Sequence, residues 1–165
     1  MKLKGTIPNL IPALLKLDLT AEFDLDVKPH KDKRSLTANS YYWSLLNQFA
    51  RWAGRSDAYI HNDILAHYGQ PYGEGFEAWI PDEPEAEFKA MESATYHMRP
   101  TDEVVWFEGE NRRKWLLMKG SSEMDTGEFS RLVDGLIQTI QCSGADIETM
   151  TPAELETLKG YHGKA

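Results

Sequence analysis

The segment from Asp125 to Ile140 constrains the fold more than any other part of the chain, because it specifies where a helix begins and which side is buried. Asp125 can accept a hydrogen bond at a helix N-terminus and Glu128 can return one to its backbone, the pattern of a capping box. Apolar side chains then recur at helical spacing: Phe129, Leu132, Val133, Leu136 and Ile140. The segment therefore predicts an amphipathic helix whose apolar stripe must be covered by other elements.

A central pair of helices is predicted between Thr37 and Tyr68. From Thr37, a candidate N-cap, to Ala53 the apolar residues fall on one helical face, and Gly54 is a stop signal. A second helix extends from Asp57 to Tyr68 and is followed by another glycine. We expect a tight turn between the two helices.

Strands are predicted on both sides of this helix pair. At the N-terminus, strands at residues 2–7 and 20–27 enclose a short helix capped by Asn9, which makes a β-α-β unit. Later in the chain, apolar runs at residues 104–107 and 114–118 flank a glycine-containing loop, the pattern of a β-hairpin.

The remaining segments complete the expected architecture. Residues 70–92 mix glycine, proline and acidic residues, which predicts a long acidic loop. Thr151, Pro152 and Glu154 form a second helix-start pattern, which predicts a short terminal helix. A chain of 165 residues can bury one sizeable core. We therefore expect a single domain over residues 1–165, an α+β fold with an N-terminal β-α-β unit, a central helix pair, a β-hairpin and two C-terminal helices.

Charge is segregated along the chain, although the net charge is −8. Residues 28–56 hold six lysines and arginines and a single acid, Asp32, whereas residues 74–110 hold 11 acids. No apolar run approaches the ~18 residues of a membrane span, so we expect no membrane partner. The single cysteine, Cys142, suits a reducing cytoplasm.

Sequence patterns of catalysis are missing from the chain. There is no Walker loop, no G-x-G-x-x-G and no G-x-S-x-G. The five histidines show no HExxH spacing, and Asp63 and His67 predict a surface contact on one helix face. The string His61-Asn62-Asp63 falls inside a predicted helix and not in a ββα nuclease finger. We therefore expect a binding protein with no catalytic residues, no metal and no cofactor.

Residues 28–56, which we call the basic block, supply both requirements of single-stranded nucleic acid binding. These are cations for phosphates and aromatic rings for base stacking. The candidate DNA-binding residues are Lys31, Lys33, Arg34, Asn39, Trp43, Arg51 and Arg55, with Arg112 and Arg113 from a second, smaller basic cluster. The alternative interpretation is that the lysines solvate a loop while Trp43 and Trp52 complete the core. Composition favours neither interpretation.

Two short motifs favour the DNA interpretation. Arg34-Ser35-Leu36, then Asn39 and Trp43, spell RSLxxNxxxW, and residues 121–132 spell S-x-x-M-x-x-GEF-x-x-L. Together they resemble the NinB (Orf) recombination family of lambdoid phages, although the acidic segment at residues 73–92 has no counterpart there. The resemblance implies a small α+β homodimer in the host cytoplasm that binds single-stranded DNA. It also implies cooperation with the host's single-strand-binding protein in loading a recombinase.

Two other functions fit parts of the sequence. The helix pair suits a helix-turn-helix regulator of duplex DNA, but its second helix bears Asp57 and Asp63 and no lysine or arginine. In a protein-interaction module, the acidic region at residues 74–110 would dock on a basic partner, with the basic block paired to it in a dimer. Single-stranded DNA binding is the leading prediction.

Overall fold

A computed structural model describes residues 7–16 and 36–160 of the chain. The chain divides into two units, Met1–Asp32 and Lys33–Ala165. The predicted N-terminal β-α-β unit falls within the first unit. Most of its two predicted strands lies outside the described residues.

Helix α1, Ile7–Leu14, is the described element of the first unit. It begins before Asn9, so the prediction that Asn9 caps this helix is wrong, and Ile7 is helical although we expected it to end a strand. Pro8 instead occupies the first turn, where its missing N–H has no intrahelical partner to lose. Pro12 lies further inside the helix than expected.

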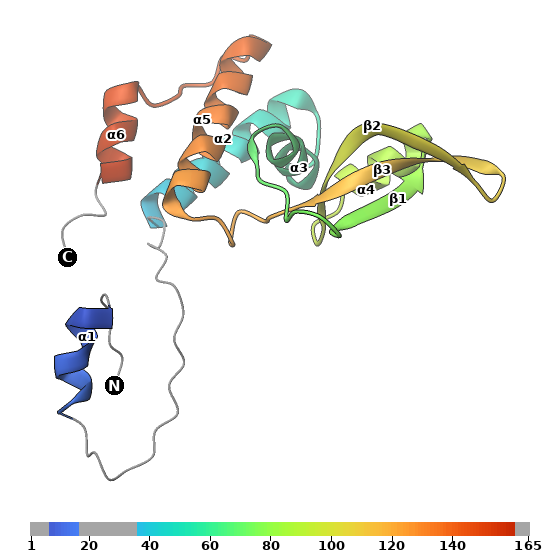
Figure 1. Ribbon diagram of the computed structural model, residues 1–165. Helices are drawn as coiled ribbons and strands as arrows, with labels where there is room; N and C mark the ends of the chain where they lie inside the picture. Colours follow the sequence, from blue (N-terminus) through green and yellow to red (C-terminus); the bar gives the residue numbers. More distant parts are fainter. Residues whose placement is uncertain (1–6, 17–35, 161–165) are drawn as a thin grey trace. The chain divides into compact units, whose positions relative to one another are not determined.

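The second unit combines a helical half with a three-stranded antiparallel sheet, which confirms the predicted α+β fold (Figure 1). The helical half contains α2, α3, α5 and α6, which span Leu36–Ala53, Asp57–Tyr68, Thr126–Ser143 and Pro152–Gly160. The sheet half contains β1, α4, β2 and β3, which span Glu77–Pro81, Pro84–Met91, His97–Phe107 and Glu110–Met118. No helix in the described part of the chain is both long and apolar enough to cross a bilayer.

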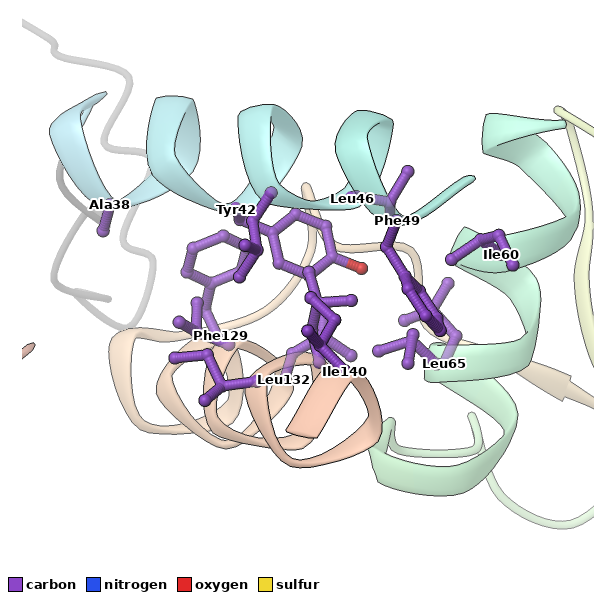
Figure 2. Close-up of a cluster of buried hydrophobic side chains, with 14 of the residues drawn as sticks. Ala38, Tyr42, Leu46, Phe49, Ile60, Leu65, Phe129, Leu132 and Ile140 are labelled. Atoms are coloured by element: carbon purple, nitrogen blue, oxygen red, sulfur yellow. The ribbon is translucent and has the colours of Figure 1, made fainter. Parts of the chain in front are cut away.

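The main hydrophobic core lies among α2, α3 and α5 (Figure 2). The predicted stripe of α5 is buried throughout, as is most of the predicted stripe of α2; these residues are Tyr42, Leu45, Leu46 and Phe49 of α2, and Phe129, Leu132, Val133, Leu136 and Ile140 of α5. Leu36 is already helical, so Thr37 is not the N-cap of α2 that we expected. Hydrophobic periodicity thus identified the buried faces better than it identified the helix start.

Helices α3 and α5 approach closely because Gly135 has no side chain. A Cβ at this position would overlap the ring of Tyr68 on α3. One turn later, the Thr139 hydroxyl lies 3.4 Å from the Tyr68 hydroxyl. The spacing between the two helices therefore depends on a glycine at position 135.

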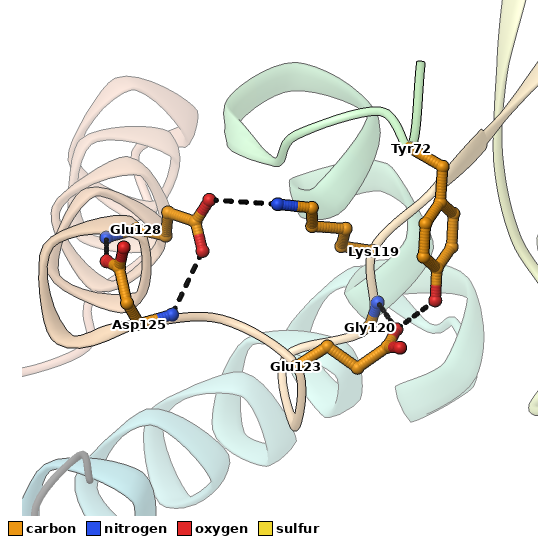
Figure 3. Close-up of polar contacts among 6 residues, drawn as sticks. All are labelled: Tyr72, Lys119, Gly120, Glu123, Asp125 and Glu128. Atoms are coloured by element: carbon orange, nitrogen blue, oxygen red, sulfur yellow. Dashed lines mark hydrogen bonds and ion pairs between the residues drawn. The ribbon is translucent and has the colours of Figure 1, made fainter. Parts of the chain in front are cut away.

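The connection from β3 to α5 is fixed by polar contacts within the second sequence motif and between the motif and neighbouring residues (Figure 3). The Glu128 amide donates to Asp125 Oδ1 at 2.8 Å, and the Asp125 amide donates to Glu128 Oε2 at 2.9 Å, which confirms the predicted capping box. Glu128 also pairs with Lys119 at 3.3 Å. Glu123 accepts from the Gly120 amide and from the Tyr72 hydroxyl. This motif therefore has a clear structural role.

Strand β3 is the centre of the sheet, with β1 and β2 antiparallel on its two sides. The predicted hairpin is confirmed, although both strands are longer than expected. Its turn contains Glu108 at φ 50° and Gly109 at φ 91°. Positive φ at both central residues is typical of the type I′ turn, whose twist matches that of paired strands.

The acidic segment that we predicted to be a loop at residues 70–92 contains strand β1 and helix α4. The prediction fails because both elements depend on distant partners. β1 pairs with β3, and Ala90 and Met91 of α4 pack on Trp115 of β3, with Ile80 and Met98 beside them. The acids within β1 and α4 are exposed, so they do not oppose regular structure.

The two halves of the second unit are joined through the side chain of Asn62, which is almost completely buried on α3. Its amide nitrogen donates to the carbonyls of Met91 and Ser93 at 2.7 and 2.8 Å. The amide oxygen lies 2.6 Å from His97 Nδ1 of β2. Because an amide oxygen can only accept, His97 Nδ1 is the donor of this hydrogen bond. One side chain thus links α3 to the end of α4 and to the start of β2.

A second pair of polar side chains adjoins this link. The Tyr42 hydroxyl lies 2.8 Å from His61 Nδ1, and burial raises the pKa of Tyr42, so the phenol remains protonated at neutral pH. The His61 and His97 rings meet edge to face with centroids 5.1 Å apart. The polar groups of this junction are therefore arranged to satisfy one another inside the fold.

Replacing Asn62 by Ala should destabilise the protein strongly. The change leaves the Met91 and Ser93 carbonyls and the His97 N–H without their partner, at roughly 1–3 kcal/mol for each buried group left unpaired, so we expect a loss of at least about 2 kcal/mol. Urea denaturation measures the free energy of unfolding. Asn111→Ala, at an exposed position on β3, is the control and should change it by less than about 0.5 kcal/mol. Equal effects of the two changes would refute the role of Asn62.

Stability should also fall as the pH is lowered through the ordinary pKa of histidine. Burial lowers the pKa of His97, and the nearby Glu123 carboxylate opposes this shift only partly. The unfolded chain then binds the proton at a higher pH than the folded chain, so the stabilisation is complete above about pH 6.5 and is lost as the pH falls below it. His97→Asn, which keeps a donor near the position of Nδ1, should flatten the dependence of unfolding free energy on pH.

Candidate nucleic-acid interface

The end of α2 and the start of α3 form an exposed corner with a defined backbone. Gly54 has φ 63°, a left-handed conformation that favours glycine, and the Arg55 amide donates to the Ala50 carbonyl at 3.0 Å. Ser56 then caps α3 by accepting from the Tyr59 amide at 3.0 Å. These contacts set the directions of the side chains at positions 51 to 59.

Arg55 lies over two aromatic rings at this corner. Its guanidinium carbon is 5.0 Å from the centre of the Tyr59 ring and 5.9 Å from that of Phe88, which comes from α4. The two rings are themselves 5.8 Å apart. Cation–π contact holds the guanidinium at the surface and leaves its N–H groups available to an anion.

Trp52 is the large exposed aromatic residue of the corner. Its ring stacks on Phe49, with an interplanar angle of 14° and centroids 5.6 Å apart, and 53% of the residue is exposed. Phe49 is buried in the core and holds one face of the indole. We define the α2–α3 corner as Arg51, Trp52, Arg55, Tyr59 and Phe88.

Arg51 and Arg55 form no ion pair with any described residue. Asp57, which begins α3, bonds to neither of them. Arg51 also lies in the last turn of α2, where a cation is stabilised by the helix dipole. The corner nevertheless keeps two positive charges that no carboxylate within the described part of the chain neutralises.

The predicted site residues of the hairpin differ in this respect. Arg112 pairs with Glu110 at 2.8 Å, and Arg113 pairs with Asp82 at 2.8 Å and donates to the Thr101 carbonyl. Both arginines are less than one-third exposed. Their charges are used within the sheet, so they are weaker candidates for phosphate contacts than Arg51 and Arg55.

Trp43 and Asn39 of the first motif are partly buried. The Trp43 ring meets those of Tyr42 and His61 at centroid distances of 5.5 and 4.7 Å, so it packs inside the unit and does not present a stacking face. The side-chain oxygen of Asn39 is buried and has no hydrogen-bond partner among the described residues. Lys31, Lys33 and Arg34 lie outside the described residues.

Of the predicted site residues, the structure leaves Arg51 and Arg55 exposed at the end of α2 and just after it, and it places the aromatic rings of Tyr59 and Phe88, which we had not predicted as site residues, against Arg55. Trp52 could have been selected from the sequence, because it lies next to Arg51 at the polar end of the helix. Phe88 could not, since the segment that carries it was predicted to be a loop and reaches the corner only through the packing of α4.

Other kinds of site find less support. α3 turns most of its length inward, burying Ile60, His61, Asn62, Ile64, Leu65 and Ala66, whereas a recognition helix needs an exposed reading face. His67 and Asp63 lie 3.5 Å apart on its surface, as predicted for a surface contact. Among the residues that the structure describes, no three His, Cys, Asp or Glu side chains are grouped as metal ligands.

No family model, curated protein or solved structure matches this chain. The resemblance to the NinB family therefore stays a prediction from the two sequence motifs. The geometry of the α2–α3 corner is independent of that resemblance, because it follows from the packing of α2, α3 and α4.

Truncation of the two tryptophans of α2 should affect the free energy of unfolding to different extents. Trp43→Ala removes a packed ring and should lower the free energy of unfolding by about 2 kcal/mol or more, whereas Trp52→Ala should change it by less than about 1 kcal/mol. Thermal and urea denaturation of the two variants measure the difference. A larger loss for Trp52→Ala would mean that Trp52 is a core residue and not a surface platform.

Proposed function

We propose that this protein binds single-stranded DNA through the α2–α3 corner. One observation carries the proposal. Arg51 and Arg55 are exposed, have no carboxylate partner in the described part of the chain, and lie on either side of the exposed Trp52 in the sequence. Lys31, Lys33 and Arg34 remain candidate DNA contacts from the sequence. Arg112 and Arg113 are secondary candidates.

The arginines supply the part of the binding energy that depends on charge. Guanidinium groups donate to phosphate oxygens in a fixed fork, and each phosphate contact releases counterions from the strand. Arg55 is already held against Tyr59 and Phe88, so its binding to phosphate would cost less side-chain entropy than that of an unsupported arginine. The interaction carries no sequence information.

Trp52 supplies the preference for a single strand. One face of its ring rests on Phe49, and its exposure leaves room for a base on the other side. The bases of a duplex are stacked on one another and cannot use this face without being unstacked. A strand that carries unpaired bases can bind both the ring and the two arginines.

The resemblance to the NinB family extends this proposal to a role. We infer a phage or prophage recombination mediator that forms a homodimer and acts in the host cytoplasm. In this role the protein would bind strands covered by the host's single-strand-binding protein and help to load a recombinase. No cofactor is needed for such a function.

Substitutions at the corner should weaken binding to a fluorescent oligothymidylate, measured by anisotropy at several salt concentrations. Arg51→Ala and Arg55→Ala should each reduce the slope of log affinity against log salt by about 0.7. Trp52→Ala should lower the affinity by about tenfold with little change in slope, because base stacking contributes about 1–3 kcal/mol without releasing counterions.

Arg131→Ala is the matched control, since Arg131 is an exposed arginine on α5 with no aromatic neighbour at the corner. It should bind the oligonucleotide like the unaltered protein. If no binding occurs at low salt, where phosphate contacts are strongest, the proposed function is wrong. If binding is equal for all four variants, DNA binds elsewhere on the protein.

A further inference from the structure

We call the hairpin at residues 101–113 the hairpin arm. It exposes apolar side chains on both of its faces. Val104 and Val105 are each 39% exposed, Phe107 is 50% exposed and Trp106 is 71% exposed. Consecutive strand residues point to opposite faces, so both faces of this strand end carry exposed apolar side chains, although the Arg112 guanidinium carbon lies 5.3 Å from the centre of the Phe107 ring. Two-stranded hairpins are marginally stable alone, and contiguous exposed apolar residues of this kind mark interaction sites.

The charges of the hairpin arm argue against a nucleic acid as its partner. Its cations are all paired: Arg112 with Glu110, Arg113 with Asp82, and Lys114 just beyond the arm with Glu77 and Glu103. Asp102 and Glu108 have no partner among the described residues. The arm therefore presents apolar side chains with two unpaired acids, which fits an apolar protein surface bordered by cations.

Pairing of β2 with β2 of a second copy is unfavourable for the same reason. β2 is an edge strand, so its outer backbone groups can accept another strand. An antiparallel pair centred on Val105 would bring Asp102 of each copy next to Glu108 in the hairpin turn of the other copy. Like charges directly opposite each other destabilise a strand pair.

The chain itself contains a surface with the required chemistry. The α2–α3 corner exposes Trp52 and Phe88 beside Arg51 and Arg55, which have no carboxylate partner in the described residues. Figure 1 shows the hairpin arm extending away from α2 and α5, so within one copy its tip does not lie on the corner. A contact between these surfaces is therefore a contact between two copies.

We propose that the hairpin arm of one copy docks on the α2–α3 corner of a second copy. Trp106 and Phe107 would cover Trp52 and Phe88, and Asp102 and Glu108 would lie near Arg51 and Arg55. The docked arm would cover the residues that bind DNA under the proposed function. The competition described next therefore rests on that function. DNA and the second copy compete for one surface, so release of the arm exposes the DNA site.

Charge reversal tests the contact, with sedimentation velocity over a series of protein concentrations as the measurement. One variant carries Asp102→Lys and Glu108→Lys on the arm, and the other carries Arg51→Glu and Arg55→Glu at the corner. The unaltered protein should associate, and each variant alone should sediment as a monomer because like charges meet at the contact. An equal mixture of the two variants should associate again, because opposite charges meet at every arm-to-corner contact.

Two outcomes overturn the proposed contact. One is an unaltered protein that remains monomeric throughout the series. The other is a mixture that fails to associate although circular dichroism shows both variants folded. All four positions are exposed, so the substitutions should not prevent folding.

Trp106→Ser tests the competition, with anisotropy of the labelled oligothymidylate as the measurement. At protein concentrations where the unaltered protein associates, this variant should bind the oligonucleotide more tightly, because the corner is no longer covered. Unchanged affinity would refute the competition. Association without any DNA binding would refute the proposed function and leave the contact standing, whereas DNA binding without association would refute the contact alone.

Discussion

The hydrogen bonds of the buried Asn62 side chain fix how the helical half of the second unit meets its sheet half. Without them, the helical half and the sheet would meet with unpaired carbonyls at Met91 and Ser93 and an unpaired N–H at His97. Such groups are costly away from water, so they make this arrangement specific in a way that apolar packing alone does not. The same contacts fix the end of α4 against α3, and α4 brings Phe88 to the corner where Arg55 and Trp52 lie.

The hairpin arm and the α2–α3 corner differ in charge because the cations of the arm form ion pairs and those of the corner form none with the described residues. On β3, Arg112, Arg113 and Lys114 are all held in ion pairs, and the arm is left with apolar side chains and two acids that have no partner among the described residues. At the corner, aromatic rings support Arg55 in place of a carboxylate, so its charge is not cancelled. An acidic protein can in this way keep a local site for an anion while its net charge is −8.

The sequence predicted those elements whose signals are local. The Asp125 and Glu128 capping box, the apolar stripes of α2 and α5 and the glycine of the hairpin turn each act within a few residues, and all were recognised. β1 and α4 were missed because pairing with β3 and packing on Trp115 decide their structure. Likewise, Arg51 and Arg55 were visible as charges, but whether a charge is paired, as in Arg113 with Asp82, depends on contacts between distant segments.

Photocrosslinking tests the central claim most directly. An oligothymidylate with single 5-iodouracil substitutions would be bound to the protein, irradiated, and the attached peptide identified by mass spectrometry. Because 5-iodouracil crosslinks to aromatic side chains in stacking contact, the account predicts attachment at Trp52. Attachment confined to Trp79 or Trp106 in the sheet half, with none at the α2–α3 corner, would contradict it.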